Sequence, residues 1–194
     1  MTTPIKVGIW SDVQCPWCFI GKRKFEAGVA EFGRPVEIEY HSFELAPDTP
    51  VDFEGSTKEY IVERKGLSEA QVDEMLARVT GIAANVGLKY DFDQVKQTNT
   101  TKAHELLHFA KAHGKQPELK ERLLSAHFEE GKHVGKLDQL ADLAAEVGLD
   151  RASALAQAYG ISGVPFYVIN GEYGISGAQD SSTFAAVLAK ATEG

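Results

Sequence analysis

Cysteine is scarce in this chain of 194 residues, which contains only Cys15 and Cys18. A set of structural disulfides is therefore excluded, and the two cysteines stand only two residues apart. In a reducing compartment, a pair at this spacing is more typical of catalysis or metal binding than of a structural disulfide.

The sequence also lacks long hydrophobic runs and blocks of basic residues. No apolar run approaches the roughly 20 residues that a membrane-spanning helix needs. Lys and Arg number 20 against 28 Asp and Glu, for a net charge of -8. We therefore expect neither nucleic acid nor a membrane as a partner. The segment from Met1 to Lys6 shows no secretory signal pattern, which predicts a cytoplasmic location.

What is present is typical of a globular protein. Hydrophobic residues make up 43% of the chain and charged residues 25%, so disorder is not indicated. The length suits one domain with its own core, or one domain that carries an insertion.

The two cysteines belong to the sequence Cys15-Pro16-Trp17-Cys18. The segment Lys6 to Trp10 before it reads as a strand, and apolar residues after it recur at helical spacing: Phe25, Val29 and Phe32. The motif is thus predicted on a strand-to-helix turn, with Cys15 as the N-cap and Pro16 at the first helical position.

This position favours a reactive thiolate at Cys15. The unpaired amides and partial positive charge of a helix N-terminus stabilise negative charge. The first cysteine of such motifs commonly has its pKa lowered from about 8.5 into the range ~3.5 to 7.5. We therefore predict Cys15 as the nucleophile and Cys18, one turn further on, as its resolving partner.

The rest of the first half is expected to contain a second strand and several helices. After a helix that ends at Gly33, residues 36–40 read as a second strand, parallel to the first. Capping boxes at Ser56 and Ser68 start two helices. Two more are expected to start at Thr100 or Thr101 and at Pro117.

The second half is expected to contain helices and a pair of strands. A helix capped by Asp138 and a shorter one reaching Gly160 are expected. Strands at residues 164–169 and 173–176 flank Asn170-Gly171, a strong hairpin signal. A final helix carries apolar residues at helical spacing: Phe184, Val187, Leu188 and Ala191.

This order resembles the thioredoxin fold. Segments that look like the FrnE-like branch of the DsbA-family oxidoreductases are Ser11 to Lys22, Ala103-His104, Gly160 to Phe166 and Gly174 to Gln179. The resemblance implies an α/β thioredoxin-like fold with a mixed sheet. It predicts a thioredoxin-like domain at residues 1–55 and 134–194, with an inserted all-helical domain at residues 56–133. Relatives have a longer helical stretch where this chain has only Arg151 to Ala158.

The resemblance also implies a thiol-disulfide oxidoreductase, which the N-terminal segment predicts to be cytoplasmic. Cys15 and Cys18 would exchange disulfides with protein or small-thiol substrates. No metal or cofactor is expected beyond the disulfide of this pair, and glutathione stays open as a co-substrate. The direction of electron flow and the oligomeric state are left open.

Five further residues are implied as substrate-binding or supporting. Pro165 would be a cis proline facing the dithiol, with the backbone of Val164 exposed to a substrate strand. His104 would line the cleft, beside Pro16 and Trp17 of the motif. Trp17 reads equally well as a substrate platform or as a ring packed over the motif.

Two zinc readings compete with this one. His104 to His108 matches the His-Glu-x-x-His pattern of metallopeptidases, with Glu129 or Glu130 as a third ligand. Cys15 and Cys18 could hold half of a zinc site, but the chain has no second cysteine pair.

A third alternative is a glutathione-dependent isomerase of the hydroxychromene-carboxylate type, because those relatives share this fold. They typically carry serine where Cys15 stands, so the retained cysteine pair favours electron exchange. The proton acceptor for Cys18 stays open among Asp12, Lys22 and His104.

Overall fold

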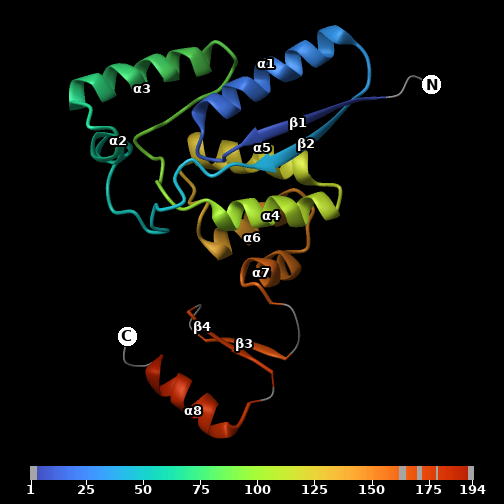
Figure 1. Cartoon of the computed structure of the whole chain (residues 1–194), viewed down its shortest axis with the longest axis vertical. Coiled ribbons are helices and arrows are strands. Elements are labelled where there is room, and N and C mark those ends of the chain that lie inside the picture. The colour runs from blue at the N-terminus through green and yellow to red at the C-terminus, as the bar shows by residue number, and fades with distance from the viewer. Residues whose placement is uncertain (1–3, 162–164, 170–171, 178, 192–194) are drawn as a thin grey trace. The chain divides into compact units, whose positions relative to one another are not determined.

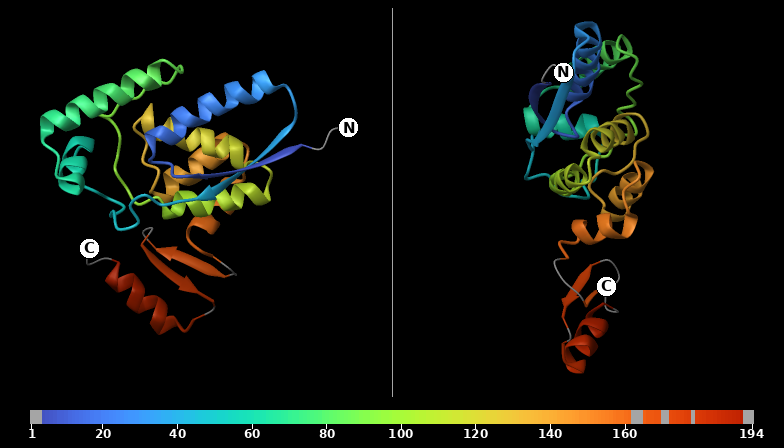
Figure 2. Two further views of the ribbon diagram at one scale, coloured as in Figure 1. Left: turned by 45° about the horizontal axis from the view of Figure 1, so that its top comes forward. Right: turned by 90° about the vertical axis from the view of Figure 1, so that its right-hand side faces the viewer.

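The computed structural model describes residues 4–161, 165–169, 172–177 and 179–191. The chain divides into two compact units, Met1–Ala158 and Tyr159–Gly194. Figures 1 and 2 show both units, and each is described here by itself. The predicted insertion at residues 56–133 remains a prediction.

The first unit begins with the predicted strand, helix and strand. Strand β1 (Ile5–Ser11), helix α1 (Pro16–Phe32) and strand β2 (Val36–Ser42) follow in order, and the two strands pair in parallel. Helix α1 ends at Gly33, whose φ of 68° is left-handed and suits glycine. The prediction for this segment is confirmed.

Helices α2 (Thr57–Lys65) and α3 (Glu69–Ala84) begin at the two predicted capping boxes. The hydroxyl of Ser56 accepts a hydrogen bond from the Glu59 amide, and the Glu59 carboxylate accepts one from the Ser56 amide. Ser68 and Gln71 exchange the same pair of bonds. Each box satisfies two amides that a helix start leaves free.

Four further helices pack against one another, as Figure 1 shows: α4 (Thr101–Ala112), α5 (Gln116–Phe128), α6 (Leu137–Glu146) and α7 (Arg151–Ala158). The predicted cap of α6 is wrong, because its N-cap is Lys136 and not Asp138. Asp138 lies in the first turn instead, where its charge still favours the helix N-terminus.

Two hydrophobic cores hold the motif between them. Val13, just before the motif, packs into the core formed by α4 to α7. Phe19 and Ile20, just after Cys18, pack into a second core with residues of α3 and α5. The strand-to-helix turn is thus fixed on both sides by burial.

The second unit contains strand β3 (Phe166–Ile169), strand β4 (Tyr173–Ser176) and helix α8 (Ser181–Lys190). The strands pair antiparallel, with Phe166 opposite Ser176, which confirms the predicted hairpin. Its turn, Asn170-Gly171, lies outside the described residues. Within the described ranges, no helix has both the length and the apolar character needed to cross a membrane.

Candidate active site

The motif lies at the start of α1 as predicted. Cys15 is the N-cap in an extended conformation, and Pro16 follows in the first turn. The Cys15 carbonyl accepts a hydrogen bond of 3.0 Å from the Cys18 amide. Both thiols are free and partly exposed. This geometry places the sulfur of Cys15 beside the open amides of the first turn.

The thiols of Cys15 and Cys18 share a hydrogen bond and titrate together. That bond, then burial, raises the pKa of Cys15, although the Cys18 and Trp17 amides act to lower it. The same bond lowers the pKa of Cys18 to about 6 against the effect of burial, helped by the Ser11 hydroxyl and the Asp12 amide. The shared hydrogen bond thus favours negative charge on one sulfur of the pair and a proton on the other.

The directions of these shifts differ from the sequence expectation. The N-cap position predicts a lowered pKa for Cys15, whereas the hydrogen bond between the thiols raises the pKa of Cys15 and lowers that of Cys18. The largest cause lies within the motif, in the hydrogen bond between the two thiols. Groups outside the motif add to it: the Ser11 hydroxyl, the Asp12 amide and the charge of Lys120 on α5. The role of Cys15 as the nucleophile stays a prediction.

The backbone of the motif is held by Tyr90. Its hydroxyl donates a hydrogen bond of 2.7 Å to the Pro16 carbonyl, and its ring stacks on Phe19 and Phe128. Trp17, by contrast, is 51% exposed. Its ring is therefore available at the surface of the site rather than packed into the core.

Asp12 connects β1 to two other segments. Its Oδ1 atom lies 3.2 Å from Nε2 of His104 on α4, and its Oδ2 atom accepts a 2.8 Å hydrogen bond from the Leu45 amide. Burial raises the pKa of Asp12, but the His104 and Leu45 hydrogen bonds outweigh burial, so the pKa is lowered. Asp12 is thus a fixed carboxylate.

The family resemblance implies that His104 lines the cleft, but the structure buries this side chain. Its Nδ1 atom has no hydrogen-bond partner among the described residues. His104 therefore supports the site from within, through Asp12.

Sequence reasoning missed Lys120. It is 1% exposed, and within the described part of the chain its Nζ atom has no hydrogen-bond partner. Nζ lies 5.9 Å from the centre of the Tyr40 ring. Burial lowers the pKa of Lys120 to about 8, while Cys18, Asp12 and Cys15 act to raise it.

A signal for Lys120 was present in the sequence. Positions 116, 119, 120, 123 and 127 form one helical stripe on α5, in which Lys120 and His127 lie beside Gln116 and the apolar Leu119 and Leu123. His127 is also buried, and burial lowers its pKa to about 4. A charged or titratable residue is costly to bury, and one with a shifted pKa is a candidate for a functional site.

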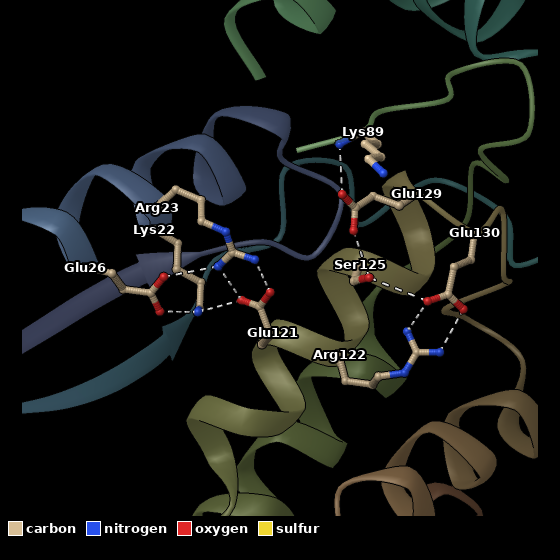
Figure 3. Close-up of polar contacts among 9 residues, drawn as sticks. All are labelled: Lys22, Arg23, Glu26, Lys89, Glu121, Arg122, Ser125, Glu129 and Glu130. Atoms are coloured by element: carbon tan, nitrogen blue, oxygen red, sulfur yellow. Dashed lines mark hydrogen bonds and ion pairs between the residues drawn. The ribbon is translucent and has the colours of Figure 1, made fainter. Parts of the chain in front are cut away.

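Helix α5 is fixed to α1 by charged groups, which Figure 3 shows. Glu121 pairs with Lys22 at 2.6 Å and with both terminal nitrogens of Arg23. Lys22 and Arg23 also pair with Glu26. Lys22 is thereby committed to ion pairs, and Glu121 holds the turn that carries its neighbour Lys120.

The His-Glu-x-x-His residues contact separate partners. Nε2 of His104 faces Asp12, whereas Nε2 of His108 lies 2.9 Å from the Ser42 hydroxyl. Glu105 pairs with Lys102 at 2.8 Å. Among the described residues, no three potential metal-ligating side chains come together.

The segment that the resemblance predicts to face the dithiol, Val164-Pro165, lies only partly within the described residues. Val164 lies outside the described residues. Pro165 belongs to the second unit, where its carbonyl accepts a 2.8 Å hydrogen bond from the Gly177 amide. The cis bond and its approach to the dithiol remain predictions.

Comparisons with known proteins identify the family. Residues 6–156 match the DSBA-like thioredoxin domain. The chain is 32% identical over 207 residues to the uncharacterized protein YwbO of Bacillus subtilis strain 168, covering 95% of this chain and 94% of that protein.

Solved structures agree. A "probable DsbA oxidoreductase" from Streptomyces coelicolor is 31% identical with a TM-score of 0.73, covering 97% of this chain and 90% of that one. A 2-hydroxychromene-2-carboxylate isomerase shares the fold at 15% identity, with a TM-score of 0.58 over 96% and 95% of the two chains. The chain belongs to the DSBA-like thioredoxin domain family and is a disulfide oxidoreductase with an α/β thioredoxin fold.

Proposed function

We propose that this protein exchanges disulfides through Cys15-Pro16-Trp17-Cys18, with Cys15 attacking the substrate and Cys18 resolving the mixed disulfide. The observation that carries this proposal is the hydrogen-bonded pair of free, partly exposed thiols at the N-terminus of α1. A thiolate is the species that attacks a disulfide, and this pair supplies one at neutral pH.

The attack begins with a proton shift inside the pair. The hydrogen bond between the thiols favours negative charge on Cys18, and the Cys15 thiol donates its proton toward it. When that proton moves to Cys18, the thiolate forms on Cys15, where the Trp17 and Cys18 amides stabilise it. Its sulfur then bonds to one substrate sulfur, and the other leaves as a thiolate.

In the second step, Cys18 attacks the sulfur of Cys15. The bond from Cys15 to the substrate breaks, and the electron pair leaves with the substrate sulfur. The substrate gains two electrons and the motif becomes a disulfide. In the cytoplasmic location that we propose, the thiol pool keeps the motif reduced, which favours reductase or isomerase work. Glutathione is a suitable reductant in that setting.

Insulin reduction by the wild type, Cys15→Ser and Cys18→Ser tests this function. We expect Cys15→Ser to abolish turnover, and Cys18→Ser to accumulate a mixed disulfide visible by mass spectrometry. Because the chain has no other cysteine, each variant leaves a single thiol. Undiminished turnover by Cys15→Ser would refute the proposal.

The same preparations separate the alternatives. Bound zinc that is lost in His104→Ala would support the metallopeptidase reading, and zinc lost in Cys15→Ser would support a cysteine zinc site. Turnover of a hydroxychromene carboxylate with glutathione, retained in Cys15→Ser, would support the isomerase.

A further inference from the structure

A proton must leave Cys18 before it can resolve the mixed disulfide, and the groups around it differ in their ability to accept that proton. Asp12 has a lowered pKa because its oxygens accept bonds from His104 and Leu45, which outweigh burial. Such a carboxylate is a weak base. His104 is tied to Asp12 through Nε2, and Lys22 is committed to Glu26 and Glu121.

Three buried nitrogens of the described residues have no hydrogen-bond partner: Nδ1 of His104, Nδ1 of His127 and Nζ of Lys120. Of these three, Lys120 interacts electrostatically with both sulfurs. We propose that Lys120 is the base that takes the proton of Cys18 when the mixed disulfide is resolved. This inference rests on the proposed exchange through Cys15 and Cys18.

Formation of the mixed disulfide itself makes Lys120 a better base. Negative charge on Cys18, Asp12 and Cys15 raises the pKa of Lys120, against burial that lowers it to about 8. Bonding of Cys15 to the substrate removes the thiolate charge from the pair, and only Asp12 of these three remains charged. The pKa of Lys120 therefore falls at the stage where a neutral amine is needed.

The surroundings of Lys120 are otherwise neutral or already paired. Tyr40 of β2 stays a neutral phenol, because burial raises its pKa to about 12. His127 on α5 stays a neutral imidazole, because burial lowers its pKa to about 4. Glu121 of the same helix is bound to Lys22 and Arg23.

The Cys18 thiol gives its proton to the neutral amine of Lys120, and the resulting thiolate attacks the sulfur of Cys15. The bond between Cys15 and the substrate breaks, and the electron pair leaves on the substrate sulfur. The ammonium of Lys120 then loses its proton to solvent, and this proton balances the one that the substrate thiolate gains.

Single-turnover reaction of the reduced protein with dithionitrobenzoate separates the two steps. The first coloured thiolate is released when Cys15 attacks, and the second when Cys18 resolves. In Lys120→Met we expect the second release to slow at least about 10-fold at neutral pH and to rise about tenfold per pH unit, because hydroxide replaces the amine. The rate of the wild type should level off at or below about pH 8, once the amine of Lys120 is neutral, whereas the rate of Lys120→Met should keep rising with pH.

Two further variants sharpen the test. Lys120→Arg keeps the positive charge but cannot give up a proton in a protein, so a base at position 120 predicts that this variant also resolves slowly. Lys22→Met is the matched control, because it removes another buried lysine of the site region, and it should resolve like the wild type. Thermal unfolding of every variant checks that the fold is kept.

The outcomes are distinct. Wild-type resolution by Lys120→Met, with an unchanged pH profile, would overturn the proposal. Full activity in Lys120→Arg would assign Lys120 a purely electrostatic role, which also overturns it. Failure of the disulfide-exchange function would appear differently, as the absence of a second release in the wild type itself.

Discussion

Nε2 of His104 lies 3.2 Å from Oδ1 of Asp12, although the two residues are 92 positions apart in the sequence. The contact joins the end of β1 to helix α4. The same carboxylate accepts the Leu45 amide at 2.8 Å. One buried side chain thus connects the strand that precedes the dithiol with a distant helix and with the loop after β2.

Asp12→Asn tests this connection. We expect the free energy of unfolding at neutral pH to fall by ~1 to 3 kcal/mol, because an amide removes charged hydrogen bonds from a buried position. Urea denaturation measures it. The matched control is Asp142→Asn, which removes an exposed carboxylate paired with Arg151 and should change stability little.

The effect of Asp12→Asn depends on pH in a defined direction. The pKa of Asp12 is lower in the folded than in the unfolded chain. Its stabilisation is therefore complete above the unfolded value of about 3.9 and is lost as pH falls through the folded value. The stability gap between wild type and variant should close on acidification, and a constant gap would contradict this account.

Glu121→Gln tests the attachment of α5 to α1 shown in Figure 3. The variant removes the carboxylate that Lys22 and Arg23 share. Because these ion pairs are partly exposed, we expect a loss of ~0.5 to 1 kcal/mol at low salt and a smaller loss at high salt. Glu118→Gln on the same helix removes an exposed carboxylate that pairs with Lys115 at 3.5 Å, and it is the control. A loss independent of salt would argue against an ion-pair origin.

Tyr90→Phe tests how the motif backbone is held. The variant keeps the ring that stacks on Phe128 but loses the 2.7 Å hydrogen bond to the Pro16 carbonyl. We expect a loss of about 1 kcal/mol by urea denaturation. Tyr167→Phe, at an exposed tyrosine, should have less effect. Equal stability of Tyr90→Phe and wild type would show that the hydrogen bond contributes nothing net.

His127→Gln tests the neutral, buried imidazole. Burial lowers the pKa of His127 from 6.5 to about 4, so between these values the unfolded chain binds a proton that the folded chain does not. Stability should fall as pH drops through this window, by on the order of 3 kcal/mol for this residue. We expect a shallower fall in His127→Gln, measured by urea denaturation across the window. The exposed control His113→Gln should keep the wild-type slope, and identical slopes in all three proteins would exclude the assignment.

Features that depend on residues close together in the sequence were the ones predicted correctly. The capping boxes at Ser56 and Ser68 were predicted correctly because their partners lie three residues away. The parallel pairing of β1 and β2 followed from the helix between them. The cap of α6 was predicted wrongly, because Asp138 favours the first turn as well as the cap.

The charge of the dithiol could not be predicted in the same way. The motif alone predicts a lowered pKa for Cys15, but the hydrogen bond between the thiols lowers the pKa of Cys18, and Lys120, more than a hundred positions away, adds to that effect. Lysine in a helix is ordinarily solvated, and only the packing of α5 against β2 and α1 shows that this one is buried.

The properties of the Cys15-Pro16-Trp17-Cys18 motif therefore depend partly on the local sequence and partly on the tertiary structure. The sequence by itself determined the strand, the turn and the N-cap position of Cys15, because these depend on neighbouring residues. Only the tertiary structure decided which distant groups add to the hydrogen bond between the thiols in shifting the pKa values of the pair. Burial and electrostatic interactions depend on elements that are distant in the sequence and meet only in the folded protein. The pKa of a group responds to both.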